Sequence, residues 1–148
     1  ALGGYAATAV TALTVQNTLG VQSVVSTSPK AVRAQMEAVL ADIGADCLKT
    51  GMLGEKALIE MLAEAFADLA PAVPRVIDPV MVATSGDRLL PREAVDAVRA
   101  LMVPGAELVT PNAPEAEVLT GKAVDSVDGQ RRAAERLLEA GADAALVK

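Results

Sequence analysis

The stretch PRVIDPV at residues 74–80 decides the fold class. Its apolar centre is typical of a buried strand, and helical periodicity flanks it over residues 55–69 and 91–102. Residues 47–50 and 107–110 predict the neighbouring short strands. Strands that alternate with helices are typical of an open parallel α/β sheet with helices on both faces.

The rest of the chain extends this alternation. The β-branched run TAVTALTV at residues 8–15 predicts a strand buried on both faces of the parallel sheet. Residues 21–26 predict a short strand near an edge. Ser28 and Pro29 predict the start of a helix that runs to about Ile43. Towards the C-terminus, the pattern predicts helices at residues 114–119 and 130–140 and a strand at 144–148. We expect a single domain over residues 1–148.

Composition excludes several classes of function. The 148 residues carry a net charge of −6, are 52% hydrophobic and only 1% aromatic, and contain no His. The apolar content excludes intrinsic disorder, and the missing His excludes Ser-His-Asp catalysis and His-ligated metal within these residues. The acidic, aromatic-poor chain argues against a nucleic-acid partner, and its apolar start is too short and Thr-rich for a membrane span. The lone Cys47 cannot form an internal disulfide, so we expect a reduced, cytoplasmic protein.

Polar residues gather where the predicted strands end. Ligands of open parallel sheets bind outside the carboxyl ends of the strands, so these residues predict one site at that edge. The runs are Gln16-Asn17-Thr18, Lys49-Thr50-Gly51-Met52, Asp78-Pro79-Val80-Met81, Thr110-Pro111-Asn112-Ala113-Pro114-Glu115 and the terminal Lys148. No Walker A sequence and no dinucleotide-binding glycine pattern is present.

Each of these residues also has a purely structural interpretation. Gln16 is compatible with a turn, Gly51 with a positive φ, and Met52 with core packing. Asn112 and Glu115 fit a helix cap and its first-turn charge, and they equally offer the oxygen ligands that Mg²⁺ prefers. These alternatives stay open.

Asp78 is the residue whose chemistry demands an explanation. It interrupts the apolar run VIDPVM, where an unpaired buried carboxylate would cost several kcal/mol. Asp78 therefore needs a cation, an N–H donor or a phosphate-bound metal beside it.

Five runs in order and at matching spacing resemble the hydroxymethylpyrimidine/phosphomethylpyrimidine kinases of thiamine biosynthesis, within the ribokinase-like superfamily. They are TALTVQNTLGV at 11–21, KTGML at 49–53, DPVMVATSGDRLL at 78–90, TPNAPEAEVLTG at 110–121 and ALVK at 145–148. The resemblance implies a ribokinase-like, three-layer α/β/α fold with an open, mostly parallel central sheet. It also implies ATP-dependent phosphorylation of 4-amino-5-hydroxymethyl-2-methylpyrimidine and of its monophosphate, with ATP as co-substrate and Mg²⁺ as the metal.

The resemblance also suggests a substrate pocket. Gln16 would hydrogen-bond the aminopyrimidine edge, and the backbone of Gly51 and Met52, together with Val80, would line the ring pocket. The loop at residues 84–87 falls where the family has a mobile flap.

A second group of residues is implied for the phosphates. Asp78 would lie near the transferring phosphate and its metal, and Lys148 would approach the phosphates as a point charge. Asn112 and Glu115 match the superfamily's Asn-x-x-Glu motif, which organises Mg²⁺ and the nucleotide phosphates. Asp78 and Glu115 are therefore the candidate Mg²⁺ ligands.

The resemblance departs at both ends of the chain. Family members begin with a further strand and a Gly-rich turn, and they continue past Lys148 into a Gly-x-Gly-[Asp/Cys] segment with the catalytic base. We therefore expect residues 1–148 to be an interior segment of one kinase domain, without a catalytic residue and inactive alone. The family suggests a homodimer. A pyridoxal-type kinase of the same fold and a non-catalytic pyrimidine-binding module remain the alternatives.

Overall fold

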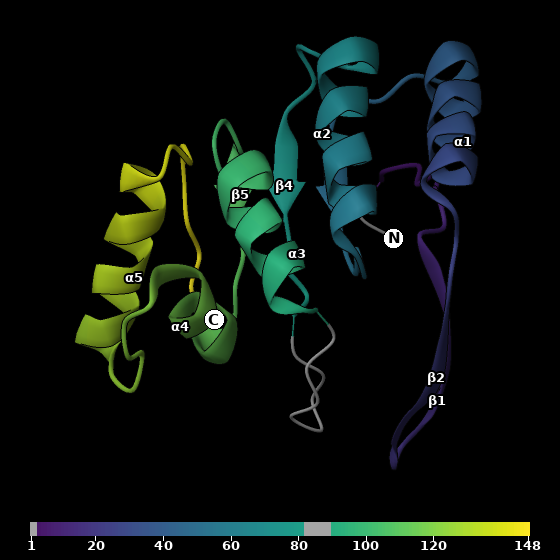
Figure 1. Ribbon diagram of the computed structural model, residues 1–148. Coiled ribbons are helices and arrows are strands. Elements are labelled where there is room, and N and C mark those ends of the chain that lie inside the picture. Colours follow the sequence, from purple (N-terminus) through teal and green to yellow (C-terminus); the bar gives the residue numbers. More distant parts are fainter. Residues whose placement is uncertain (1–2, 82–89) are drawn as a thin grey trace.

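A computed structural model describes residues 3–81 and 90–148 (Figure 1). In chain order its elements are β1 (Ala12–Asn17), β2 (Gly20–Ser26), α1 (Pro29–Asp42), β3 (Leu48–Thr50), α2 (Lys56–Leu69), β4 (Arg75–Ile77), α3 (Arg92–Ala97), the π-helix η1 (Val98–Met102), β5 (Leu108–Val109), α4 (Ala113–Thr120) and α5 (Val127–Glu139).

The central sheet is parallel, with strand order β3-β4-β5. Its register places Thr50 opposite Ile77, and Ile77 opposite Val109. The end of the chain adds a parallel bridge between Val109 and Ala145. The predicted α/β class and parallel sheet are confirmed. Strand β4 is shorter than the predicted 74–80 run, because Pro79 has no N–H to donate to a neighbouring strand.

The core lies between one face of this sheet and the helices. Ile77 and Val109 are buried there together with side chains from α1, α2, α3, η1 and α5. On the opposite face Lys49 is exposed, and both its register partner Val76 and the partner of Val76, Leu108, are only half-buried. Figure 1 shows α1, α2, α3 and α5 side by side in front of the strands. The helices of the described ranges thus pack on one sheet face, and they supply one of the two helical layers that the sequence predicts.

The first strand differs from its prediction. Instead of a buried parallel strand, β1 pairs antiparallel with β2 in a separate two-stranded sheet. Its Leu13 and Val15 are 62% and 51% exposed, and the hairpin projects from the body of the molecule (Figure 1). Only Thr18 and Leu19 separate the two strands, which is too short for the crossover that a parallel pair requires. The composition of the strand is compatible with either arrangement.

Local signals explain the helix boundaries. The hydroxyl of Ser28 accepts a hydrogen bond from the N–H of Ala31, and Pro29 occupies the first turn, as predicted for α1. Helix α5 begins before the predicted residue 130 because Ser126 caps it by accepting from the N–H of Gly129. Among the described residues, no helix is both long and apolar enough to cross a membrane.

Candidate functional site

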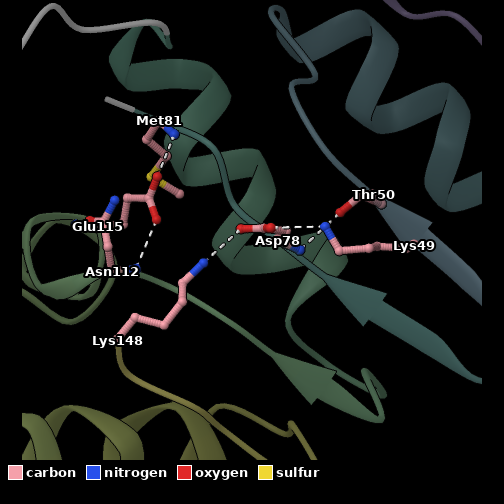
Figure 2. Close-up of polar contacts among 7 residues, drawn as sticks. All are labelled: Lys49, Thr50, Asp78, Met81, Asn112, Glu115 and Lys148. Carbon is pink, nitrogen blue, oxygen red and sulfur yellow. Dashed lines mark hydrogen bonds and ion pairs between the residues drawn. The ribbon is translucent and has the colours of Figure 1, made fainter. Parts of the chain in front are cut away.

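The carboxyl ends of the strands bring charged and polar side chains from four segments to one edge of the sheet (Figure 2). Lys49 comes from β3 and Asp78 follows β4. Glu115 lies in the first turn of α4, which follows β5, and Lys148 ends the segment beside β5. Parallel pairing therefore assembles the predicted phosphate-side residues.

Asp78 is the centre of this cluster. Its Oδ2 lies 2.9 Å from the Nζ of Lys49, and its Oδ1 lies 3.6 Å from the Nζ of Lys148. Its backbone N–H donates to the hydroxyl of Thr50 at 3.2 Å. The Asp78 side chain is 19% exposed. Asp78 therefore has two cationic partners, and a cation is one of the kinds of partner that the sequence predicts for it.

The environment keeps Asp78 ionised. Burial by itself raises the pKa of this carboxyl, but the hydrogen bond and the charge of Lys49, helped by Lys148, outweigh it. The pKa of Asp78 consequently lies below its ordinary value of 3.8. Two ammonium groups and one carboxylate leave one net positive charge at neutral pH.

Lys49 is a residue of the cluster to which the sequence alone assigns no role. It stood among the strand-end residues, but nothing distinguished it there from an ordinary exposed lysine. The signal available in the sequence was its position, since Lys49 precedes the last residue of one strand and Asp78 follows the next. That signal becomes decisive only when the register of β3 against β4 is known.

Glu115 ties two segments together. The residue is 3% exposed, and its Oε1 accepts from the N–H of Met81 at 3.1 Å while Oε2 accepts from the N–H of Asn112 at 2.9 Å. Asn112 Oδ1 in turn accepts from the N–H of Glu115 at 2.9 Å. This reciprocal pair is a capping box that starts α4, and the bond to Met81 fixes the chain after β4 against it (Figure 2).

The donor set allows a test of the predicted Mg²⁺ ligands. The described residues contain no cluster of three or more His, Cys, Asp or Glu side chains that could hold a metal. Both carboxylates already have partners: Glu115 accepts from two N–H donors, and each oxygen of Asp78 faces an exposed lysine ammonium. Mg²⁺ is commonly bound through one or two carboxylates plus substrate phosphates and water. Asp78 fits that pattern as the more accessible carboxylate, and the roles of both residues stay predictions.

The predicted pyrimidine-side residues are more widely placed. Gly51 and Met52 follow β3 and Val80 follows β4, so they lie towards the same edge as Asp78. Met52 is half-buried, and its carbonyl accepts from the hydroxyl of Thr11 at 2.7 Å, which ties the base of the hairpin to this edge.

Gln16 is exposed on β1, opposite Val21 beside an irregularity in the register. No hydrogen bond within the described ranges joins it to the Asp78 cluster. Its predicted role stays a prediction, and the predicted flap at residues 84–87 lies outside the described residues.

A cavity of about 510 Å³ lies elsewhere, between η1 and the C-terminal ends of α4 and α5. Its Arg99 donates to the carbonyls of Val118 and Leu119 and so caps α4. None of the predicted site residues lines this cavity. The strand-end cluster, with its paired charges, is the stronger candidate for chemistry.

Comparison with known proteins identifies the family. The family model described as phosphomethylpyrimidine kinase matches residues 1–148. The hydroxymethylpyrimidine/phosphomethylpyrimidine kinase of Mycobacterium leprae (strain TN) is 44% identical over 147 residues, which are 99% of this chain and 53% of the relative. The Bacillus subtilis (strain 168) protein of that name is 41% identical over 145 residues, which are 97% of this chain and 53% of the relative. The chain thus spans about half the length of these relatives.

Solved structures agree with the fold. The crystal structure of phosphomethylpyrimidine kinase from Clostridium difficile 630 matches with a TM-score of 0.90 and 37% identity, over 99% of this chain and 63% of that one. The pyridoxal kinase from Staphylococcus aureus in complex with pyridoxal matches with a TM-score of 0.82 and 30% identity, over 95% of this chain and 50% of that one. The fold is therefore ribokinase-like.

Replacing Glu115 tests the link between α4 and the chain after β4. In Glu115→Gln the new amide group would face one of the two N–H donors, which leaves a buried donor unsatisfied. We expect the free energy of unfolding to fall by about 1–3 kcal/mol in urea titration. Glu93→Gln, an exposed first-turn glutamate of α3, is the matched control and should change stability by less than about 0.5 kcal/mol. Equal losses for the two variants would contradict the bonding described for Glu115.

The depressed pKa of Asp78 predicts a pH dependence of stability. Because the folded pKa lies below the unfolded one, the ionised carboxylate stabilises the fold above pH 3.8, and this contribution is lost as the pH falls through the folded pKa. The difference in unfolding free energy between the wild type and Asp78→Asn should therefore shrink between about pH 5 and pH 2. A constant difference across that range, measured by urea titration, would show that the lysines do not stabilise the charged form.

Proposed function

The chain belongs to the phosphomethylpyrimidine kinase family, and from that premise we propose that the intact protein is an ATP-dependent kinase of thiamine biosynthesis. Its substrates are 4-amino-5-hydroxymethyl-2-methylpyrimidine and the monophosphate of that compound. The observation that carries the proposal is the positively charged Lys49–Asp78–Lys148 cluster at the strand ends, beside the capping box of α4. The family match over residues 1–148 supports it.

The arrangement suits phosphoryl transfer, in which positioning and charge neutralisation supply most of the catalysis. Lys148 places an ammonium group at the edge where phosphates would lie, and the N-terminus of α4 adds backbone dipoles that favour anions. Asn112 and Glu115 fix that helix start, and their reciprocal bonds occupy their own N–H groups, so the contribution of α4 is the helix dipole. Mg²⁺ entering with ATP would supply further neutralisation of the phosphate oxygens, with Asp78 as the carboxylate that holds it.

Residues outside 1–148 complete the site in this proposal. The curated relatives are nearly twice as long as the chain. We assign to no described residue the role of taking the proton from the substrate hydroxyl. The catalytic base comes from that further part of the domain, and residues 1–148 alone have no kinase activity.

We also propose a nucleotide co-substrate, a homodimer and a cytoplasmic location, each supported by a different observation. Complexes of the Staphylococcus aureus pyridoxal kinase with ADP and with AMP-PCP support a nucleotide co-substrate for this chain. The family resemblance supports a homodimer. The exposed apolar residues of the β1–β2 hairpin also support it, because a second subunit would cover them. The unpaired Cys47 supports a cytoplasmic location.

A pyridoxal-type kinase is the second candidate, because the Staphylococcus aureus enzyme shares the fold at 30% identity. Identities of 41–44% to pyrimidine kinases favour the first. A non-catalytic pyrimidine-binding module is the third, and it would keep the ligand pocket without the base.

Substrate choice separates these candidates. The intact protein, incubated with ATP, Mg²⁺ and either 4-amino-5-hydroxymethyl-2-methylpyrimidine or pyridoxal, should convert the pyrimidine to its mono- and diphosphate, as followed by chromatography. Turnover of pyridoxal alone would favour the second candidate. Binding of the pyrimidine in calorimetry without turnover of either compound would favour the module.

Gln16 provides a test of substrate recognition. Its side-chain amide offers both a donor and an acceptor, which match an aminopyrimidine edge. We expect Gln16→Ala to raise the KM for the pyrimidine roughly three- to tenfold, as one lost hydrogen bond would, and to leave the KM for ATP unchanged. Gln22→Ala, on β2 of the same exposed hairpin, is the matched control. If both variants behave alike, Gln16 does not recognise the pyrimidine.

A further inference from the structure

We propose that Lys49 is a positioning residue: it holds the Asp78 carboxylate so that Lys148 can leave that carboxylate and bind a phosphate group. The inference rests on the proposed function for the identity of the anion. The assignment of different roles to the two lysines rests on the geometry of the described residues alone.

The two ion pairs of Asp78 are unequal. The Lys49 ammonium donates to Oδ2 at 2.9 Å, which is the length of a charge-assisted hydrogen bond. The Lys148 ammonium stands 3.6 Å from Oδ1, beyond the usual hydrogen-bond range. Asp78 thus has one close partner and one loose partner.

The backbone explains the difference. Lys49 lies on β3, directly beside β4, where Thr50 pairs with Ile77 and also accepts the N–H of Asp78. The Lys49–Asp78 contact is therefore built into the strand register. Lys148 reaches Asp78 from the far side of β5, anchored by its N–H to the carbonyl of Pro111 at 2.9 Å (Figure 2). Only its flexible side chain sets the distance to Asp78.

Both lysines are exposed, so the looser contact, and not the exposure, makes Lys148 the partner that can leave. The side chains of Lys49 and Lys148 are 59% and 49% exposed, whereas Asp78 is 19% exposed. A loose, exposed ion pair contributes little to stability, so Lys148 can exchange Asp78 for an incoming anion at small cost. Asp78, the most buried member, keeps its partner Lys49 throughout.

The same geometry predicts what happens without Lys49. Asp78 would then have Lys148 as its remaining partner among the contacts described, and the carboxylate would hold that ammonium more tightly. An incoming phosphate would have to compete with Asp78 for Lys148. Removal of Lys49 would therefore weaken phosphate binding without Lys49 touching the phosphate.

Binding of inorganic pyrophosphate to the intact protein, measured by isothermal titration calorimetry at fixed ionic strength, tests the proposal. Lys148→Met should weaken binding on the order of tenfold and Lys49→Met about two- to fivefold, and Lys49→Arg should restore the affinity. Lys56→Met removes a lysine of similar exposure that pairs with Glu60 on α2, and it should leave the affinity unchanged. Thermal unfolding of each variant confirms that the fold is intact.

The Asp78→Asn background decides between a positioning role and direct contact. If Lys49 acts through Asp78, adding Lys49→Met to Asp78→Asn should cause no further loss of affinity. An equal loss in both backgrounds would overturn the proposal, because Lys49 would then attract the anion directly. Unchanged affinity in Lys49→Met, or in Lys148→Met, would overturn it as well.

The calorimetric measurement does not depend on turnover, so it separates this inference from the proposed function. A protein that binds pyrophosphate as described and phosphorylates no pyrimidine would refute only the function. In an active enzyme, Lys49→Met should raise the KM for ATP about two- to fivefold and change kcat less than the KM.

Discussion

Parallel pairing of β3, β4 and β5 is the constraint from which the remaining features follow. The register that aligns Thr50, Ile77 and Val109 buries all three and brings three strand ends to one edge. Crossovers between parallel strands are right-handed, and β3, β4 and β5 follow one another in one direction, so α2, and α3 together with η1, cover the same face. Core and candidate site are thus two products of one pairing pattern.

The same strand pairing offsets the desolvation cost of the half-buried Asp78 carboxylate. Asp78 leaves β4 where the neighbouring strands still determine the position of the backbone, and its charge is satisfied by lysines from both sides. Desolvation alone would favour the neutral acid, yet the lysines reverse the balance and keep the pKa low. The strand ends therefore hold a fixed negative charge between two positive ones, of which the lysine bound to the adjacent strand is the more constrained.

The sequence predicted the features that depend on local pattern. Helical periodicity and capping residues located α1, α2 and α4 closely, and the interrupted apolar run singled out Asp78. It did not predict the β1–β2 hairpin, because apolar β-branched residues suit a buried strand and a projecting ribbon equally. It gave no role to Lys49, because the pairing of β3 with β4 is a property of the assembled sheet.

The buried carboxylate of Glu115 has a mechanical consequence. One of its oxygens binds the backbone after β4, and the other binds the start of α4. Separation of these two segments would therefore expose the buried Glu115 carboxylate and break its hydrogen bonds. The backbone at Met81 and the start of α4 are therefore held together as one rigid unit.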